Sequence, residues 1–183
     1  MSGKYKTGEA AIAHFVTCTV VGWVDVFSRE LYKEIVIKSL AYCQKEKGMK
    51  LFAYVIMTNH LHLIIASETN NISDIMRDFK KYTSKQIIAA IGANIQESRK
   101  EWMMNMFRYA GSSNSANKEY QFWQHEFHPI VLDTVEKQRQ RLLYLHQNPV
   151  RAGLVWQPQD YKYSSAIDYY TDLKDGLISV ELL

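Results

Sequence analysis

Two strand-like runs separated by two residues constrain the fold of this 183-residue chain more than any other feature. Residues 50–57 and 60–67 are rich in β-branched, aromatic and other apolar side chains, and Thr58 and Asn59 stand between them as a short turn or bulge. So short a connection joins antiparallel neighbours, because parallel strands need a crossover of about a dozen residues or more. The sequence therefore predicts a β-hairpin within an antiparallel sheet.

Glycines and capping residues mark the ends of the other predicted elements. These elements are a strand over residues 14–21, helices over residues 28–48, 71–92, 96–109 and 134–147, and a short last helix capped by Ser164 or Ser165. The helix over 134–147 is expected to stop before Asn148 and Pro149, because proline disfavours helical backbone in the residue before it. Residues 111–118 form a small, polar loop. The order indicates an α+β fold, with helices mainly on one face of an antiparallel sheet.

Length and composition favour one cytoplasmic domain. The chain is long enough for one well-packed core, and its longest apolar stretches are far too short to span a membrane. Residues 1–10 lack the hydrophobic run of a signal peptide. Cys18 and Cys43 have no zinc-binding spacing and are interpreted as reduced core thiols.

His60 and His62 are the strongest chemical signal in the sequence. Alternate side chains of a strand point to the same face, so both imidazoles share one side of the second hairpin strand, about 7 Å apart along the backbone. Imidazole is a common metal ligand, and such a pair can converge on one ion. The competing interpretation is a chance pair of histidines on a half-exposed strand face.

Tyr82 and Gln86 are the second candidate pair. They are four residues apart and therefore neighbours on one face of the predicted helix over 71–92. Gln86 could complete a metal site, and Tyr82 could act as a nucleophile if positive charge from Lys81, Lys85 or the ion stabilises its ionised form. The alternative is that the Tyr82 ring simply packs on the sheet.

Charge by itself does not indicate a nucleic-acid partner. The formal net charge is only +3, which is ordinary for solubility. Residues 74–100 carry six basic and three acidic side chains, which makes one local basic face. On charge alone, a solvated helix surface is the favoured explanation of such a face.

The sequence resembles the single-tyrosine HUH transposases, and more closely the REP-associated tyrosine transposases. HUH denotes two histidines around a hydrophobic residue, here His60, Leu61 and His62. The resemblance covers nearly the whole chain through an ordered series of segments, at residues 15–17, 53–63, 79–84, 122–124, 127–128, 144–155 and 163–165.

The resemblance implies a single HUH transposase-like domain over residues 1–183, with about 112–183 as a family-specific extension. It implies a ferredoxin-like fold with the HUH motif on a central strand. His60 and His62 would hold Mg²⁺ or Mn²⁺, with Gln86 as a third ligand, and Tyr82 would form a 5′-phosphotyrosine with single-stranded hairpin DNA. The implied assembly is a homodimer. The residues assigned to DNA binding are Arg77, Lys80, Lys81, Lys85 and Arg151.

The sequence leaves two other functions open. One is a hairpin-binding protein without catalysis, and the other is a metal-dependent hydrolase that activates water. His125 and His128 could suggest a second metal site, although phosphate binding or packing is favoured for them. Arg139 or Arg141 could contact a DNA backbone.

Overall fold

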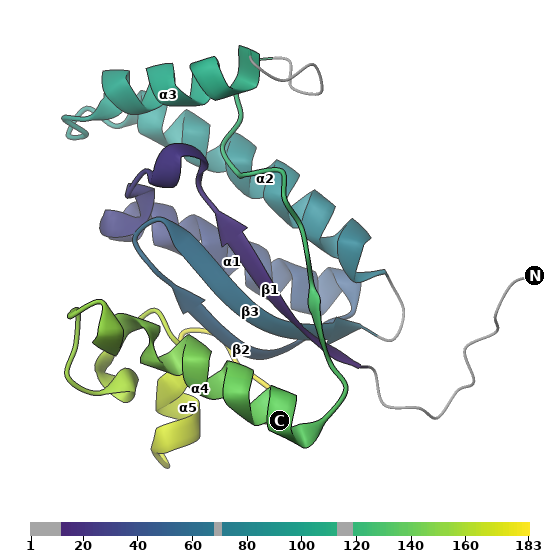
Figure 1. Ribbon diagram of the computed structural model, residues 1–183. Helices are drawn as coiled ribbons and strands as arrows, with labels where there is room; N and C mark the ends of the chain where they lie inside the picture. Colours follow the sequence, from purple (N-terminus) through teal and green to yellow (C-terminus); the bar gives the residue numbers. More distant parts are fainter. Residues whose placement is uncertain (1–11, 68–70, 113–118) are drawn as a thin grey trace, which may run out of the picture.

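The computed structural model describes residues 12–67, 71–112 and 119–183, which form a four-stranded antiparallel sheet and its covering helices (Figure 1). The strands are β1 (Ala13–Thr19), β2 (Met49–Ile56), β3 (His60–Ser67) and β4 (Ile130–Leu132). The helices are α1 (Glu30–Lys47), α2 (Ile72–Ala93), α3 (Lys100–Ser112), α4 (Val135–Arg151) and α5 (Ala166–Tyr170). Short 3-10 turns are η1 (Val21–Trp23), η2 (Val26–Ser28) and η3 (Pro158–Asp160).

The strand order is β2-β3-β1-β4, so β3 and β1 are the inner strands. Each pair of neighbours is antiparallel, and the predicted hairpin is present as β2 and β3. The order makes β1 parallel to β2, with α1 between them in the chain, and β3 parallel to β4, with α2 and α3 between them. This is the ferredoxin-like arrangement, and it puts the HUH strand β3 inside the sheet.

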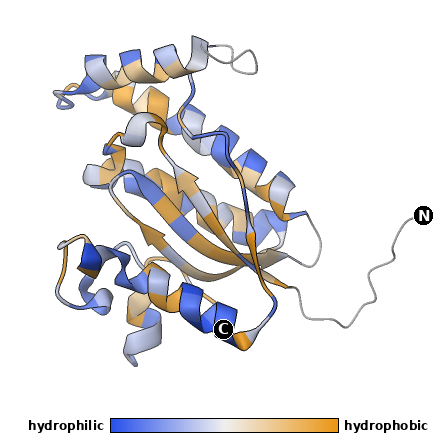
Figure 2. Cartoon of the chain, in the orientation of Figure 1, coloured by the Kyte–Doolittle hydropathy of each residue, from blue (hydrophilic) through white to orange (hydrophobic). Residues whose placement is uncertain are grey.

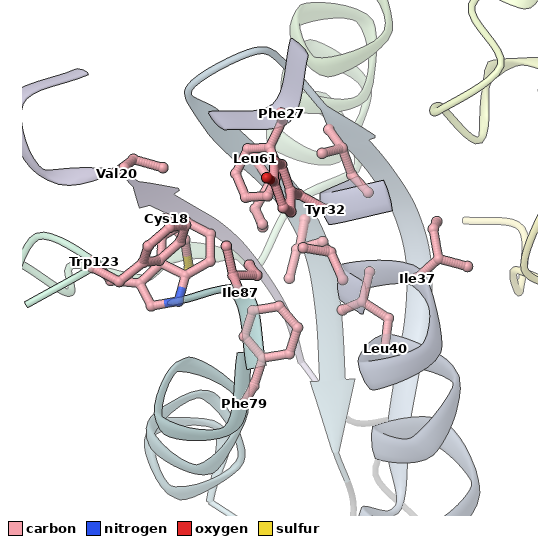
Figure 3. Packing of buried hydrophobic residues seen from close by; sticks show 14 of the residues in the cluster. Cys18, Val20, Phe27, Tyr32, Ile37, Leu40, Leu61, Phe79, Ile87 and Trp123 are labelled. Atoms are coloured by element: carbon pink, nitrogen blue, oxygen red, sulfur yellow. The ribbon is translucent and has the colours of Figure 1, made fainter. Parts of the chain in front are cut away.

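One face of the sheet is covered by α1 and α2, and it holds the main core. Leu61, Leu63 and Ile65 of β3 are fully buried on this side. Figure 3 shows Leu61 within the same cluster as Phe79 and Ile87 of α2. Burying one such side chain stabilises the fold by roughly 1.5–3 kcal/mol, so this layer supplies much of the hydrophobic stabilisation.

The other face of the sheet carries α4 and a smaller apolar cluster. Phe15, Val55, Ile64 and Leu132 of the strands pack there with Leu145 of α4. In Figure 2 the strands are largely hydrophobic and α4 is largely hydrophilic, with few apolar positions. The α+β fold with an antiparallel sheet is confirmed, with one refinement: the helices are divided between both faces, and α4 is the one that matters for the site.

Several helix ends follow the capping signals, but α1 begins at Glu30 after Arg29 rather than at residue 28, and α3 spans Lys100–Ser112 rather than residues 96–109. Gly48 adopts the left-handed conformation (φ 64°) that closes α1, and Asn71 caps α2 by accepting a hydrogen bond from the backbone N–H of Ser73. The prediction that the helix stops before Asn148 is wrong, since α4 continues through Pro149 to Arg151. A proline so near the end of a helix removes only one backbone hydrogen bond. Most of the predicted loop, residues 113–118, lies outside the described residues.

A buried carboxylate ties the start of α1 to the turn before α3. The side chain of Glu97 is fully buried and accepts hydrogen bonds from Arg29 Nε (2.6 Å) and Arg99 Nε (3.2 Å). Cys18 and Cys43 are both buried free thiols. Within the described segments, no helix is long and apolar enough to cross a membrane.

Candidate functional site

Strand β3 presents two histidines on the α4 side of the sheet. His60 and His62 alternate with Leu61 and Leu63, which face α1 and α2. The imidazole ring centroids lie 4.8 Å apart with an interplanar angle of 70°. The predicted pairing of the two rings on one face is therefore present in the fold.

The ring of His62 is held in place by two contacts. It stacks on Phe15 at 5.0 Å between centroids, and its Nδ1 lies 2.8 Å from Thr17 Oγ1. Its Nε2 is buried and has no hydrogen-bond partner among the described residues. With Nδ1 satisfied by Thr17, Nε2 is the atom left to bind a ligand.

The two imidazoles are neutral near neutral pH. Burial lowers the pKa of His60, and burial together with His60, Arg141 and Arg151 lowers the pKa of His62 to about 3. His60 Nδ1 also lies 2.7 Å from Asn59 Oδ1, which fixes the orientation of that ring. A neutral imidazole keeps the lone pair that metal binding requires.

Helix α4 brings Tyr144 to the histidine pair. The Tyr144 ring lies 5.5 Å from the His62 ring and 6.0 Å from Phe15, and the residue is 38% exposed. Asn148 lies one helical turn beyond Tyr144 and donates from Nδ2 to the Tyr144 carbonyl at 3.0 Å. The structure thus brings two imidazoles and a phenol together on one side of the sheet, with the Asn148 amide one helical turn from the phenol.

Two arginines of α4 surround Tyr144. The Arg151 guanidinium lies 4.5 Å from the centre of the Tyr144 ring and donates to the Tyr144 carbonyl at 2.8 Å. The Arg141 guanidinium lies 6.0 Å from the same ring and 5.3 Å from that of Phe15. This positive charge next to a phenol suits an anionic substrate such as a phosphodiester.

Tyr82 and Gln86 are not brought to the histidine pair. Both line a groove between α1 and α2, together with Tyr42 and Lys38, and these helices cover the sheet face opposite the histidines. The sheet separates Tyr82 from His62 within one chain. Within one chain, Tyr82 and Gln86 therefore do not complete the site at the histidines.

The predicted DNA-binding residues divide into three groups. Arg151 lies in the site. Lys80 donates to the Gln124 carbonyl at 2.8 Å, and Arg77 pairs with acidic residues of its own helix, so both make contacts within the chain. Lys81 and Lys85 are exposed on α2, the helix on the opposite side of the sheet from the histidines.

Other metal-binding arrangements find no support in the described part of the chain. His125 and His128 are exposed in the segment before β4. Residues 12–67, 71–112 and 119–183 contain no group of three or more His, Cys, Asp or Glu side chains that could hold an ion. A metal site at β3 would therefore need a further ligand beside its two imidazoles, such as an amide oxygen or a substrate oxygen.

Sequence reasoning missed Tyr144 and Asn148 as site residues. Their spacing of four is the same as that of Tyr82 and Gln86, so the signal was present. It was hidden because the predicted helix ended at residue 147, which separated the asparagine from the tyrosine.

The sequence matches the family model described as "Transposase IS200 like" over residues 9–120. This match spans more than half of the chain, which therefore belongs to the IS200-like transposase family. Members of this family are transposases, enzymes that cleave DNA. Tyr144 and the rest of α4 lie beyond the matched residues.

A solved structure of similar fold supports this architecture. A REP-associated tyrosine transposase bound to a REP hairpin aligns with a TM-score of 0.62 and 18% identity, over 100% of this chain and 92% of that chain. A candidate transposase from Deinococcus radiodurans aligns with a TM-score of 0.46 and 14% identity, over 79% of this chain and 97% of that chain. No curated protein matches the sequence.

Proposed function

We propose that this chain is a metal-dependent transposase that cleaves and rejoins single-stranded DNA, with Tyr144 as the nucleophile. The observation that carries the proposal is the contact of the Tyr144 ring with His62, at 5.5 Å between centroids. Membership of the IS200-like family supplies the chemical class. Tyr144 replaces Tyr82 in the role that the sequence resemblance implied.

The residues present fit a divalent ion. The buried Nε2 of His62 has no other partner among the described residues, and both imidazoles are held neutral by burial. His60, His62 and the amide oxygen of Asn148 would supply a mixed nitrogen and oxygen donor set, which suits Mn²⁺ well and Mg²⁺ with additional waters. A bound ion would polarise the scissile phosphate. Asn148 takes the place that the resemblance gave to Gln86.

The proposed reaction keeps the number of phosphodiester bonds constant. The Tyr144 phenol attacks phosphorus, the new bond joins its oxygen to the 5′-phosphate, and the departing 3′-oxygen takes up a proton as the phenol loses one. A 3′-hydroxyl of a second DNA end reverses these steps at the same phosphorus. Arg141 and Arg151 offset the negative charge of the phosphate, since both guanidinium groups lie near the phenol ring.

A DNA hairpin is the proposed substrate feature. The solved REP-associated transposase of similar fold is bound to a REP hairpin, and the positive charge at α4 is compatible with a nucleic-acid backbone. The homodimer implied by the resemblance stays a prediction. Because Tyr144 meets the histidines of its own chain, the proposed chemistry does not need a tyrosine from a partner.

The test is a covalent adduct with labelled, hairpin-bearing single-stranded DNA in Mn²⁺ or Mg²⁺, resolved on a denaturing gel. We expect an adduct in the wild type and in Tyr82→Phe, and none in Tyr144→Phe or with a chelator. Tyr82→Phe is the matched control, because it removes a hydroxyl from an exposed tyrosine on the opposite face of the sheet.

An adduct that persists in Tyr144→Phe and is lost in Tyr82→Phe would overturn this assignment and favour the sequence-based nucleophile. DNA binding with no adduct in the wild type would instead favour a hairpin-binding protein without catalysis. Cleavage that survives both substitutions would indicate a hydrolase that activates water.

A further inference from the structure

Trp23 is an exposed tryptophan in a backbone conformation that is costly for its type. Its φ is 56°, in the left-handed region that bulky residues rarely adopt. The residue is 60% exposed, whereas Val21 and Val24 on either side of it are buried. Packing of the indole therefore offers little to offset the strain, which points to a role outside folding.

The turn that carries Trp23 is fixed to its surroundings. Gly22 is also left-handed (φ 63°), and a β-carbon there would lie 2.9 Å from Cε of Met106 in α3. Asn59 Nδ2 donates to the Trp23 carbonyl at 3.3 Å, and the same side chain meets His60 through its oxygen. Trp23 is thus held in a defined position relative to the histidine pair.

The indole lies beside the proposed reaction site. Its ring centroid is 6.1 Å from that of His60, with an interplanar angle of 72°. Tyr144 lies next to His62, so the order across the site is Trp23, His60, His62, Tyr144. A DNA strand with its phosphate at the histidines can extend toward Trp23 on one side while Arg141 and Arg151 lie on the other.

We propose that Trp23 is the stacking platform for an unpaired base next to the scissile phosphate. This inference rests on the proposed function, and it adds a nucleotide-binding subsite to it. A nucleobase is the fitting occupant, because an exposed indole stacks on any base and a single strand has bases without partners. The strained, anchored turn holds the platform ready before DNA binds.

The experiment measures binding of a fluorescently labelled, unstructured oligo-dT by anisotropy, without metal and with EDTA. Trp23→Asn removes the ring but suits the left-handed backbone, and Trp23→Phe keeps an aromatic face. We expect Trp23→Asn to weaken binding by about 5- to 100-fold, the range for one base stacked on an aromatic ring, and Trp23→Phe to retain most of the affinity. Trp102→Asn, which alters a tryptophan 52% exposed on α3, is the control and should bind as the wild type does.

Wild-type affinity in Trp23→Asn, or equal losses in Trp23→Asn and Trp102→Asn, would overturn the proposal. So would a loss that comes with a lower melting temperature, because that would give Trp23 a structural role. The adduct assay with metal tests the proposed function separately. If the wild type forms no adduct, the catalytic proposal is refuted. If Trp23→Asn binds oligo-dT weakly in the same series, the stacking subsite is still supported.

Discussion

The hydroxyl of Thr17 orients His62, and its removal should weaken divalent-metal binding while leaving the fold intact. Thr17 Oγ1 lies 2.8 Å from Nδ1 of the ring, and Nε2 is the atom without a partner among the described residues. A proton on Nδ1 that is donated to Thr17 leaves the lone pair of Nε2 for an ion. Thr17→Val keeps the shape of the side chain and removes the acceptor.

The expected magnitude follows from this one hydrogen bond. Its net contribution to folding is about 1 kcal/mol, which for a chain of this size lowers the melting temperature by roughly 2–4 °C. Metal binding suffers more, because the ring loses its orientation and its fixed tautomer. Loss of such a supporting contact typically costs about 10–100-fold in metal affinity, and we expect a rise of that size in the Kd for Mn²⁺.

Isothermal titration with Mn²⁺ compares the wild type with Thr17→Val and Thr19→Val. Thr19 is the matched control, because it lies two residues further on the same strand and faces the same side, opposite His60 in the register. Within the described residues, its side chain makes no hydrogen bond to either histidine. An unchanged Kd in Thr17→Val, or an equal rise in Thr19→Val, would refute the orienting role.

Three further predictions concern stability and the ion. Burial alone would raise the pKa of Glu97, but hydrogen bonds from Arg99 and Arg29 hold this pKa below its usual value. The ionised Glu97 therefore stabilises the fold at pH values above the ordinary glutamate pKa. This stabilisation is lost as the pH falls through the lowered pKa of the folded state. Urea unfolding at neutral and acidic pH should show a smaller acid loss in Glu97→Gln than in the wild type. Gly111→Ala should destabilise the fold by about 1–3 kcal/mol in urea unfolding, because its β-carbon would lie 2.7 Å from the Glu119 carbonyl oxygen; wild-type stability would contradict this. Asn148→Ala should raise the Kd for Mn²⁺ more than about tenfold in calorimetry, and an unchanged value would exclude Asn148 as a ligand.

Local features of the fold were predictable because their causes are local. The two-residue connection required an antiparallel hairpin, and strand alternation put His60 and His62 on one face. Gly48 closes α1 because glycine accepts a left-handed backbone without strain. These conclusions needed only residues within a few positions of one another.

The sequence pointed to Tyr82 rather than to Tyr144 because the position of each tyrosine relative to the histidines depends on which sheet face its helix covers. Tyr82 and Tyr144 both lie on amphipathic helices with an amide side chain four residues later, so local sequence cannot separate them. Right-handed crossovers between parallel strands favour placing α1 and α2 together on one face. The apolar residues of β3 turn toward that face, which leaves His60 and His62 on the other, with α4.

Pro149 led to a wrong prediction of the end of α4. A proline usually marks a helix boundary, because it disfavours helical backbone before it. Here the residue is buried in the last turn of α4, close to the C-terminal end at Arg151. The helix gives up one hydrogen bond and buries the proline ring, so the boundary rule failed and the four-residue spacing of Tyr144 and Asn148 within one helix was not recognised.

The alternation of β3 means that stability and chemistry depend on interleaved positions of a single strand. Leu61 and Leu63 belong to the main core, while His60 and His62 belong to the site. Inserting or deleting one residue in this strand would exchange the two sets, placing imidazoles in the core and leucines at the reaction centre. A saturation screen of residues 60–63 should therefore alternate, residue by residue, between variants that accumulate normally but do not join DNA and variants that fail to accumulate in the cell.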